Sequence, residues 1–257
     1  MRIRSVFDHR EYPLPIPLPD YREREAGAWI TCAFLLIFAL AAAPTSVPAD
    51  VDPALWQRML DIDSRSAQIQ NLVADFQQEK HTALLKRPLL SKGKVYATTN
   101  VMRWDTAEPE PTVMRIDESS AAIYYPKEKL EEVYPVTGQL GSLAASPLPR
   151  LDRLKQHFTF AADPEAKTDE KQLALVLTPV DPSLREHVDR VRVLLDAERG
   201  LMLRVEVLDA DGDRTSIVFS DVRTNVGLKD PSLPIDLPPG VKVSRPLENL
   251  GTPPQRK

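Results

Sequence analysis

The spacing of apolar residues near residue 50 first predicts a helix. Asp52 followed by Pro53 is typical of a helix N-cap and first helical position. Apolar residues then recur at helical spacing: Leu55, Met59 and Ile62. The pattern predicts a helix that ends near Gln68.

From Asn71 the period changes to two, because Leu72, Ala74 and Phe76 alternate with Val73, Asp75 and Gln77. This alternation predicts a half-buried strand. Similar patterns predict further strands over residues 92–98, 101–105, 112–117, 122–125, 129–135, 173–178, 188–196, 201–209 and 215–222. Residues 138–149 are loop-like, and the apolar positions after them predict a short amphipathic helix: Leu148, Leu151, Leu154 and Phe158.

The C-terminal third has the clearest alternation. One set of positions is apolar: Val191, Val193, Leu195, Leu201, Leu203, Val205, Val207, Ile217 and Phe219. The opposite set is charged: Arg190, Arg192, Arg204 and Glu206. The connections between these strands are short and polar. We therefore expect an antiparallel meander with one apolar face and one wet face.

These elements define the expected fold class, which is α+β. Two short helices cannot cover both faces of a sheet of roughly ten to eleven strands. We expect the sheet to curl on itself, with the helices covering its concave apolar face. That geometry creates an apolar cavity lined by alternate strand residues.

The chain before the first helix has two distinct parts. Residues 1–27 are polar and proline-rich and are predicted to be disordered. Residues 28–43 carry no charge, and 28–49 therefore serve either as a signal peptide cleaved before Asp50 or as a membrane anchor. Both alternatives place the protein outside the cytoplasm, in the periplasm. The folded domain is expected over residues 50–243, and residues 244–257 are expected to form a flexible tail.

Composition excludes several classes of function. The formal net charge of -4 argues against nucleic-acid binding. The single cysteine, Cys32, allows no disulfide framework and no thiolate metal cluster. Asp209 and Asp213 belong to an Asp-Ala-Asp-Gly-Asp sequence, for which an acidic hairpin turn is a better interpretation than a calcium loop. No nucleotide or hydrolase motif occurs, so we expect no enzymatic activity, no cofactor and no metal.

Four stretches together resemble a known family. They are Leu72–Gln78; Gly93–Tyr96 followed by Met102-Arg-Trp104; Ile116-Asp117 followed by Ile123-Tyr-Tyr-Pro126; and Ile217–Val222 followed by a Pro-Pro-Gly-Val ending. In order and spacing they are similar to the outer-membrane lipoprotein carrier (LolA) family over residues 53–243. One departure is that Ala97-Thr-Thr-Asn100 replaces the basic Lys-Arg-Pro of many members.

The resemblance implies an unclosed antiparallel half-β-barrel and a monomeric periplasmic carrier. Such a carrier receives acylated lipoprotein or lipid cargo from an inner-membrane ABC transporter and passes it to an outer-membrane receptor. The loop at residues 81–90 is closer to relatives in other lipid-export systems, so the cargo is either a lipoprotein or a glycolipid. A membrane-anchored envelope sensor remains an alternative, and a lipid-acting enzyme is the last one.

The resemblance also marks candidate residues for an apolar cavity. They are Phe76, Tyr96, Met102, Trp104, Ile123, Tyr125, Leu203, Val205 and Phe219. The alternative interpretation of the same residues is ordinary core packing. His81, close to Lys80 and Lys86, is either a basic contact for a partner or part of a solvated loop.

Overall fold

The computed structural model describes residues 51–135, 148, 151–228 and 230–246. Within these ranges the chain forms three helices: α2 (Pro53–Ser66), α3 (Leu151–Leu154) and α4 (Pro182–Arg185). It also forms twelve strands: β1 (Asn71–His81), β2 (Leu89–Thr98), β3 (Met102–Glu108), β4 (Thr112–Ile116), β5 (Ser120–Tyr125), β6 (Leu130–Pro135), β7 (Phe158–Ala162), β8 (Gln172–Pro179), β9 (Val188–Asp196), β10 (Leu201–Asp209), β11 (Arg214–Thr224) and β12 (Lys242–Ser244).

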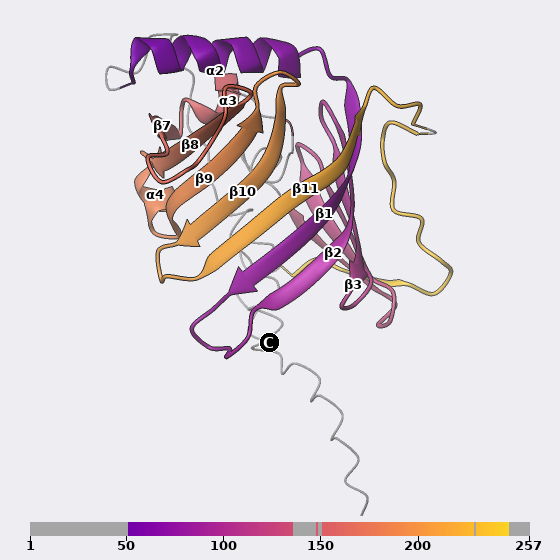
Figure 1. Ribbon diagram of the computed structural model, residues 1–257. Helices are drawn as coiled ribbons and strands as arrows, with labels where there is room; N and C mark the ends of the chain where they lie inside the picture. The colour runs from indigo at the N-terminus through magenta and orange to yellow at the C-terminus, as the bar shows by residue number, and fades with distance from the viewer. Residues whose placement is uncertain (1–50, 136–147, 149–150, 229, 247–257) are drawn as a thin grey trace, which may run out of the picture.

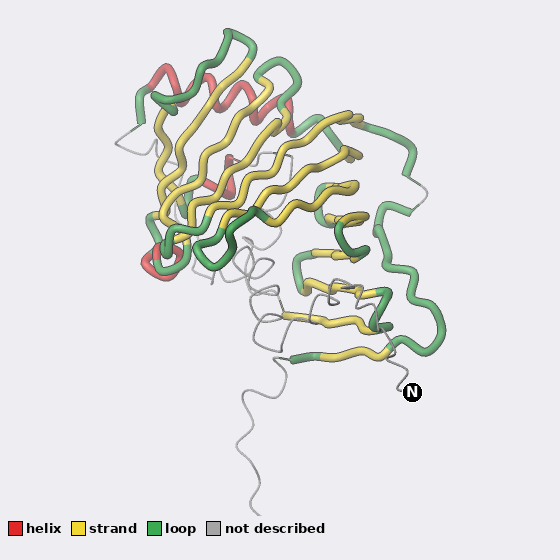
Figure 2. The backbone as a smooth tube through the Cα atoms, turned by 60° about the horizontal axis from the view of Figure 1, so that its bottom comes forward, coloured by secondary structure: helices red, strands yellow, loops and turns green. Residues whose placement is uncertain are grey.

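All twelve strands belong to one sheet, in the order β12-β6-β5-β4-β3-β2-β1-β11-β10-β9-β8-β7. Neighbouring strands are antiparallel, except that β12 pairs parallel with β6. The sheet bends strongly near its middle, so that β2–β6 turn away from the plane of β8–β11 (Figures 1 and 2). The expected fold class, an unclosed antiparallel half-barrel, is therefore correct.

Helix α2 forms where the sequence predicts it. The Asp52 side chain caps the helix by accepting a 2.9 Å hydrogen bond from the Leu55 N–H, and Pro53 occupies the first turn. The helix ends at Ser66, two residues before the predicted end. It lies across the ends of β8–β10, where the Arg58 guanidinium donates to the carbonyls of Glu170 and Gln172 (Figure 1).

The turn between β9 and β10 must pass close beneath α2. Gly200 lies in this turn with a φ of +68°, and a Cβ added there would lie 2.6 Å from the Ser66 backbone nitrogen. Only glycine combines this left-handed backbone with so close an approach. On the same side, Arg65 donates a 2.9 Å hydrogen bond to the Ala197 carbonyl. The helix is therefore fixed to one end of the C-terminal strands.

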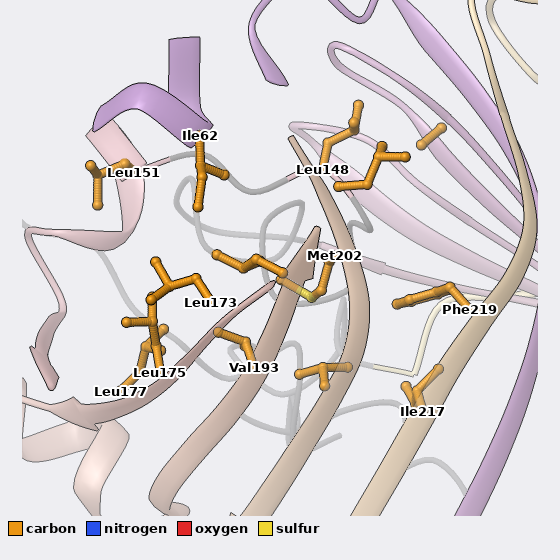
Figure 3. Close-up of a cluster of buried hydrophobic side chains, with 14 of the residues drawn as sticks. Ile62, Leu148, Leu151, Leu173, Leu175, Leu177, Val193, Met202, Ile217 and Phe219 are labelled. Atoms are coloured by element: carbon orange, nitrogen blue, oxygen red, sulfur yellow. The ribbon is translucent and has the colours of Figure 1, made fainter. Parts of the chain in front are cut away.

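The hydrophobic core is continuous along the inner face of β7–β11. Figure 3 shows Ile62 of α2 and Leu151 of α3 above rows of strand side chains. Those rows contain Leu173, Leu175, Leu177, Val193, Leu195, Val205, Val207 and Ile217, all buried. Arg190 and Arg204 on the opposite face are exposed. The predicted separation into an apolar and a wet face is confirmed.

Some sequence predictions were wrong in detail. Phe158 begins strand β7 and is not part of the short helix, which has only four residues. Strand β12 extends to Ser244, the first residue of the expected tail, and the strand count exceeds the predicted ten to eleven. The expectations for residues 1–49 and 247–257, and for all of the loop at 138–149 except Leu148, lie outside the described residues.

None of the helices in the described ranges is long and apolar enough to cross a membrane.

Candidate binding face

The inner face of the sheet continues from β11 across β1 to β5. Strand register places Ala74, Val95, Trp104, Met114 and Ile123 in one row across five consecutive strands. A second row contains Leu72, Ala97, Met102, Ile116 and Ala121. Every member of the two rows is buried except Met114, which is partly buried. These rows form the candidate binding face.

Three aromatic rings meet where β11, β1 and β3 contribute to this face. The rings of Phe76 and Trp104 pack in a T-shaped arrangement, with a centroid distance of 4.7 Å and an interplanar angle of 68°. Phe219 approaches Trp104 from β11 at 6.0 Å. Such tilted and edge-on pairs are the preferred geometry of aromatic contacts. The sequence predicted all three residues as cavity residues, and the fold brings them together.

The indole N–H of Trp104 is buried and has no hydrogen-bond partner among the described residues. The side chain is held inside an apolar cluster, with only 5% of the residue exposed. Leaving such a donor unpaired costs about 1–3 kcal/mol relative to its hydration in the unfolded chain. The Trp104 N–H is therefore a buried donor in an apolar cluster, from which a carbonyl oxygen of a ligand could accept a hydrogen bond.

Gly93 on β2 lies opposite Phe76 in the register, at a bulge between β2 and β3. A Cβ at this position would lie 2.0 Å from the Asp105 carbonyl oxygen, which is backbone and cannot rotate away. The glycine therefore allows β3 to approach β2 closely. This approach positions Trp104, one residue before Asp105, against Phe76.

The other candidate residues do not all share this face. Met102 and Ile123 are buried on it, and the register places Tyr125, which is half-buried, on it as well. Val205 is also buried, but it belongs to β10 and lies in the core of the C-terminal strands. Tyr96 is on the outer face, because its neighbours Val95 and Ala97 face inward and strand side chains alternate. The expectation for Tyr96 was therefore wrong. The apolar character of its two neighbours was a usable signal in the sequence.

Leu203 is also misplaced by the sequence prediction. The register of β10 against β9 shifts between Met202 and Arg204, so Leu203 is the extra residue of a bulge. Met202 takes the inner position and joins the buried cluster (Figure 3). Leu203 is half-buried and outside that cluster. Uninterrupted alternation cannot anticipate a one-residue insertion. Met114 and Val95 are further inner-face residues that the sequence analysis missed.

The outer face of β3–β6 is covered in part by the strap, the connection from β11 to β12 formed by residues 225–228 and 230–241 (Figure 1). The Arg103 guanidinium donates to the Pro234 carbonyl at 2.5 Å, and Arg115 donates to the Ser232 carbonyl at 3.1 Å. Leu233, between these two acceptors, is buried. The strap is thus fixed on the side of the sheet opposite the candidate binding face.

Each strap arginine also pairs with an aspartate two residues further along its strand. Arg103 contacts Asp105 at 2.7 Å, and Arg115 contacts Asp117 at 2.5 Å. Burial alone would raise the pKa of the Asp117 carboxyl, but hydrogen bonds from Arg115, Ser119 and Ser120 outweigh it and hold that pKa well below its ordinary value. The carboxylate therefore stays ionised and orients the guanidinium.

Two further features of the molecule are polar. A hollow of about 640 Å³ at the bulge between β1 and β11 is lined by charged side chains, including Lys94, Arg199 and Arg223, and does not suit acyl chains. In the β10–β11 turn, the carboxylates of Asp209, Asp211 and Asp213 lie within 4.8 Å of one another and could ligate a cation.

That acidic turn has a counter-ion within the chain. The Lys80 ammonium lies 3.6 Å from the Asp213 carboxylate. Burial raises the pKa of Asp209 to about 6, and the nearby carboxylates add to this effect against the attraction of Lys80. The predicted acidic hairpin turn is present, and two of its carboxylates, Asp209 and Asp213, interact with the buried Lys80 ammonium.

A single curved antiparallel sheet with an apolar inner face and a helix over one half places the chain in the class of half-barrel proteins. The family model of the outer membrane lipoprotein carrier protein LolA matches residues 67–232, and the chain belongs to that family. A comparison with curated proteins gave no match.

Several solved structures are similar to this chain. An uncharacterized conserved protein from Thermus thermophilus shares 15% identity with a TM-score of 0.48, covering 74% of this chain and 99% of its own. The Mycobacterium tuberculosis lipoprotein LppX shares 10% identity with a TM-score of 0.41, and the match covers 73% of this chain and 100% of LppX. A chain of the Pseudomonas aeruginosa MucA/MucB complex shares 14% identity with a TM-score of 0.42, and the match covers 70% of this chain and 60% of that chain.

Proposed function

We propose that this protein is a non-catalytic periplasmic carrier that binds the acyl chains of lipoproteins on its candidate binding face. The observation that carries the proposal is the unpaired Trp104 indole N–H, held between Phe76 and Phe219 in apolar surroundings. Membership of the LolA family supports the same function. The proposed partners are an inner-membrane ABC transporter and an outer-membrane receptor.

Physical chemistry gives such a face both affinity and reversibility. Each CH₂ group that leaves water contributes about 0.8 kcal/mol, so a few acyl chains would bind very tightly to a rigid, open cavity. When the face carries no cargo, methionine and aromatic side chains pack against one another. Displacing these contacts offsets part of the gain from acyl-chain binding. Met102, Met114 and Trp104 are side chains of this kind on the candidate binding face. A receptor with a better-fitting cavity can then accept the cargo.

The first experiment identifies the cargo. The protein is purified from the native cell envelope, and what copurifies is analysed by mass spectrometry. Acylated lipoprotein supports the proposal, whereas a glycolipid would assign the chain to another lipid-export system. Recovery of protein with no acylated molecule, together with no binding of a fluorescent fatty acid, would contradict the proposal.

A matched pair of variants tests the site itself. Trp104→Ala is expected to weaken binding of the fluorescent fatty acid more than it lowers the free energy of unfolding. Leu195→Ala, in the core of the C-terminal half, is expected to lower the free energy of unfolding by about 2–5 kcal/mol and to leave affinity unchanged. If Trp104→Ala instead only destabilises the fold, Trp104 is a core residue and the proposed site is wrong.

A further inference from the structure

The hairpin between β1 and β2 ends in a segment that we call the leucine tip, residues 82–90. It contains Leu84, Leu85, Leu89 and Leu90, which are the most concentrated group of exposed large apolar side chains in the described residues. Leu84 is 87% exposed and Leu90 is 63% exposed. Contiguous exposed apolar side chains of this kind mark interaction sites, because their contact with water is unfavourable.

The geometry of the hairpin explains this exposure. Leu89 and Leu90 pair with Lys80 and Glu79 and, as consecutive strand residues, point to opposite faces. Both are exposed, so the end of the hairpin extends beyond the point where either face of the sheet is covered. Figure 1 shows this hairpin projecting from the end of the sheet opposite α2. The leucine tip can therefore enter an apolar environment outside the protein.

Two cations accompany the leucines. Lys86 and Arg87 are exposed, and neither forms an ion pair with any described residue. The nearby lysines differ, because Lys80 pairs with Asp213 and Lys92 with Glu108. The positive charge at the leucine tip is therefore not neutralised within the described part of the chain.

The base of the leucine tip is held in place by acidic groups. The Ala83 N–H donates to the Asp213 carboxylate at 3.3 Å, which ties the tip to the β10–β11 turn. Glu79, at the end of β1, contacts the His81 ring at 2.5 Å. These carboxylates lie at the root of the tip and are engaged there, so the projecting part carries leucines and cations.

We infer that the leucine tip inserts into the interface of a membrane that contains anionic lipids. Leucine side chains at this point would leave water for the acyl region, while the long Lys86 and Arg87 side chains reach back to the lipid phosphates. A protein pocket deep enough to bury four leucines would also bury two unpaired cations, which is unfavourable unless it supplies matching carboxylates. The inference concerns where the protein docks and does not depend on which cargo it carries.

A local probe tests this inference in the full chain. Leu84→Cys, in a Cys32→Ser background, is labelled with an environment-sensitive NBD dye and mixed with vesicles. We expect the NBD emission to rise and shift to shorter wavelength with phosphatidylglycerol-containing vesicles, and to change little with pure phosphatidylcholine vesicles. The matched control is Leu60→Cys in α2, at the other end of the sheet and 40% exposed, where no change is expected.

The control also removes an ambiguity of the full chain. If the uncharged residues 28–43 hold the protein on vesicles, both labelled proteins are held equally, and only the label at position 84 reports on the leucine tip. Adding Lys86→Gln and Arg87→Gln is expected to weaken the response to anionic vesicles by roughly ten-fold or more. An unresponsive label at position 84, or an equal response to both vesicle types, would overturn the inference. A failure to bind fatty acid would contradict the proposed function but not this inference.

Discussion

The two halves of the sheet bury their inner faces in different ways. In the C-terminal half, β7–β11, rows of leucine and valine pack beneath Ile62 of α2 and Leu151 of α3 (Figure 3). In the N-terminal half, β2–β6, the inner rows contain Met102, Trp104 and Met114, and the helices of the described ranges lie over the other half (Figure 1). The outer face of this N-terminal half is the one that the strap covers.

This difference separates folding from binding. Branched aliphatic side chains that fill one another's spaces give a stable core and leave no room for a ligand. A face that includes two methionines and a tryptophan with an unpaired indole N–H is less completely satisfied. We therefore expect substitutions in the C-terminal half to act on stability and substitutions in the N-terminal half to act on binding.

The largest effect is expected where α2 packs on the C-terminal half. Ile62→Ala removes a side chain that is almost fully buried, and should lower the free energy of unfolding by about 2–5 kcal/mol. Urea denaturation followed by circular dichroism measures this change. Leu60→Ala on the exposed side of the same helix is the control and should change stability by less than about 0.5 kcal/mol. Equal effects of the two substitutions would show that α2 does not cover a packed core.

An intermediate effect is expected on the outer face of the N-terminal half. Asp117→Ala removes the partner of Arg115 and should lower the free energy of unfolding at pH 7 by about 1–3 kcal/mol. Because the folded-state pKa of Asp117 is depressed, its contribution is present above the unfolded pKa of about 3.8 and is lost as the pH falls through the folded value. The difference between wild type and variant should therefore be smaller at pH 3 than at pH 7.

Urea titrations of both proteins at the two pH values measure this difference. Ser119→Ala, which removes only one of the hydrogen bonds to that carboxylate, serves as the graded control. A difference that stays constant with pH would mean that the carboxylate of Asp117 does not hold Arg115 and the strap.

Most of the C-terminal half was predictable because most of its features are local in sequence. The Asp52-Pro53 start of α2 and the strand alternation up to Ile217 depend on a few neighbouring residues. Most strands were predicted from such local patterns. The errors came from features set by how one strand pairs with another. The bulge at Leu203 depends on the register against β9, and β12 depends on where the strap returns to pair with β6. Neither partner is visible in the local pattern.

The candidate binding face was predicted in part for the same reason. Phe76, Trp104 and Phe219 were identified as apolar positions on three strands, and their contact follows once β1 pairs with β11. Tyr96 was assigned to the wrong face, although its neighbours Val95 and Ala97 are apolar and strand side chains alternate. The unpaired state of the Trp104 indole could not be predicted, because it depends on every side chain that surrounds it.

A smaller effect on stability is expected from Trp104→Phe in the N-terminal half. The substitution removes some ring area but also removes a buried donor without a partner among the described residues, and these contributions should cancel to within about 1 kcal/mol of the free energy of unfolding. Fatty-acid binding should nevertheless weaken, because the carbonyl of the bound chain loses its donor. Guanidinium denaturation and a fluorescence titration measure the two quantities.

The matched control for this prediction is Trp56→Phe. Trp56 is a partly buried residue of α2 whose ring lies 6.4 Å from that of Phe160 in the other half of the sheet. It should leave fatty-acid affinity unchanged. A loss of about 3 kcal/mol or more on Trp104→Phe would instead indicate a tightly packed core at Trp104 and would remove the distinction between the two halves.

The smallest effect is expected from Asp209→Asn, at the polar end of the C-terminal half. The folded-state pKa of Asp209 is raised to about 6, mainly by burial, so its stabilising contribution is present below pH 4 and is lost as the pH rises through about 6. At pH 7.5 the variant avoids a partly buried charge and should have a slightly higher Tm than wild type, whereas at pH 4 the two should melt together. Thermal melts at both pH values test this, with Asp211→Asn in the same turn as the control. A lower Tm for Asp209→Asn at pH 7.5 would mean that attraction to Lys80 outweighs burial, so that this end of the half is stabilised by charge and the packed core stops short of it.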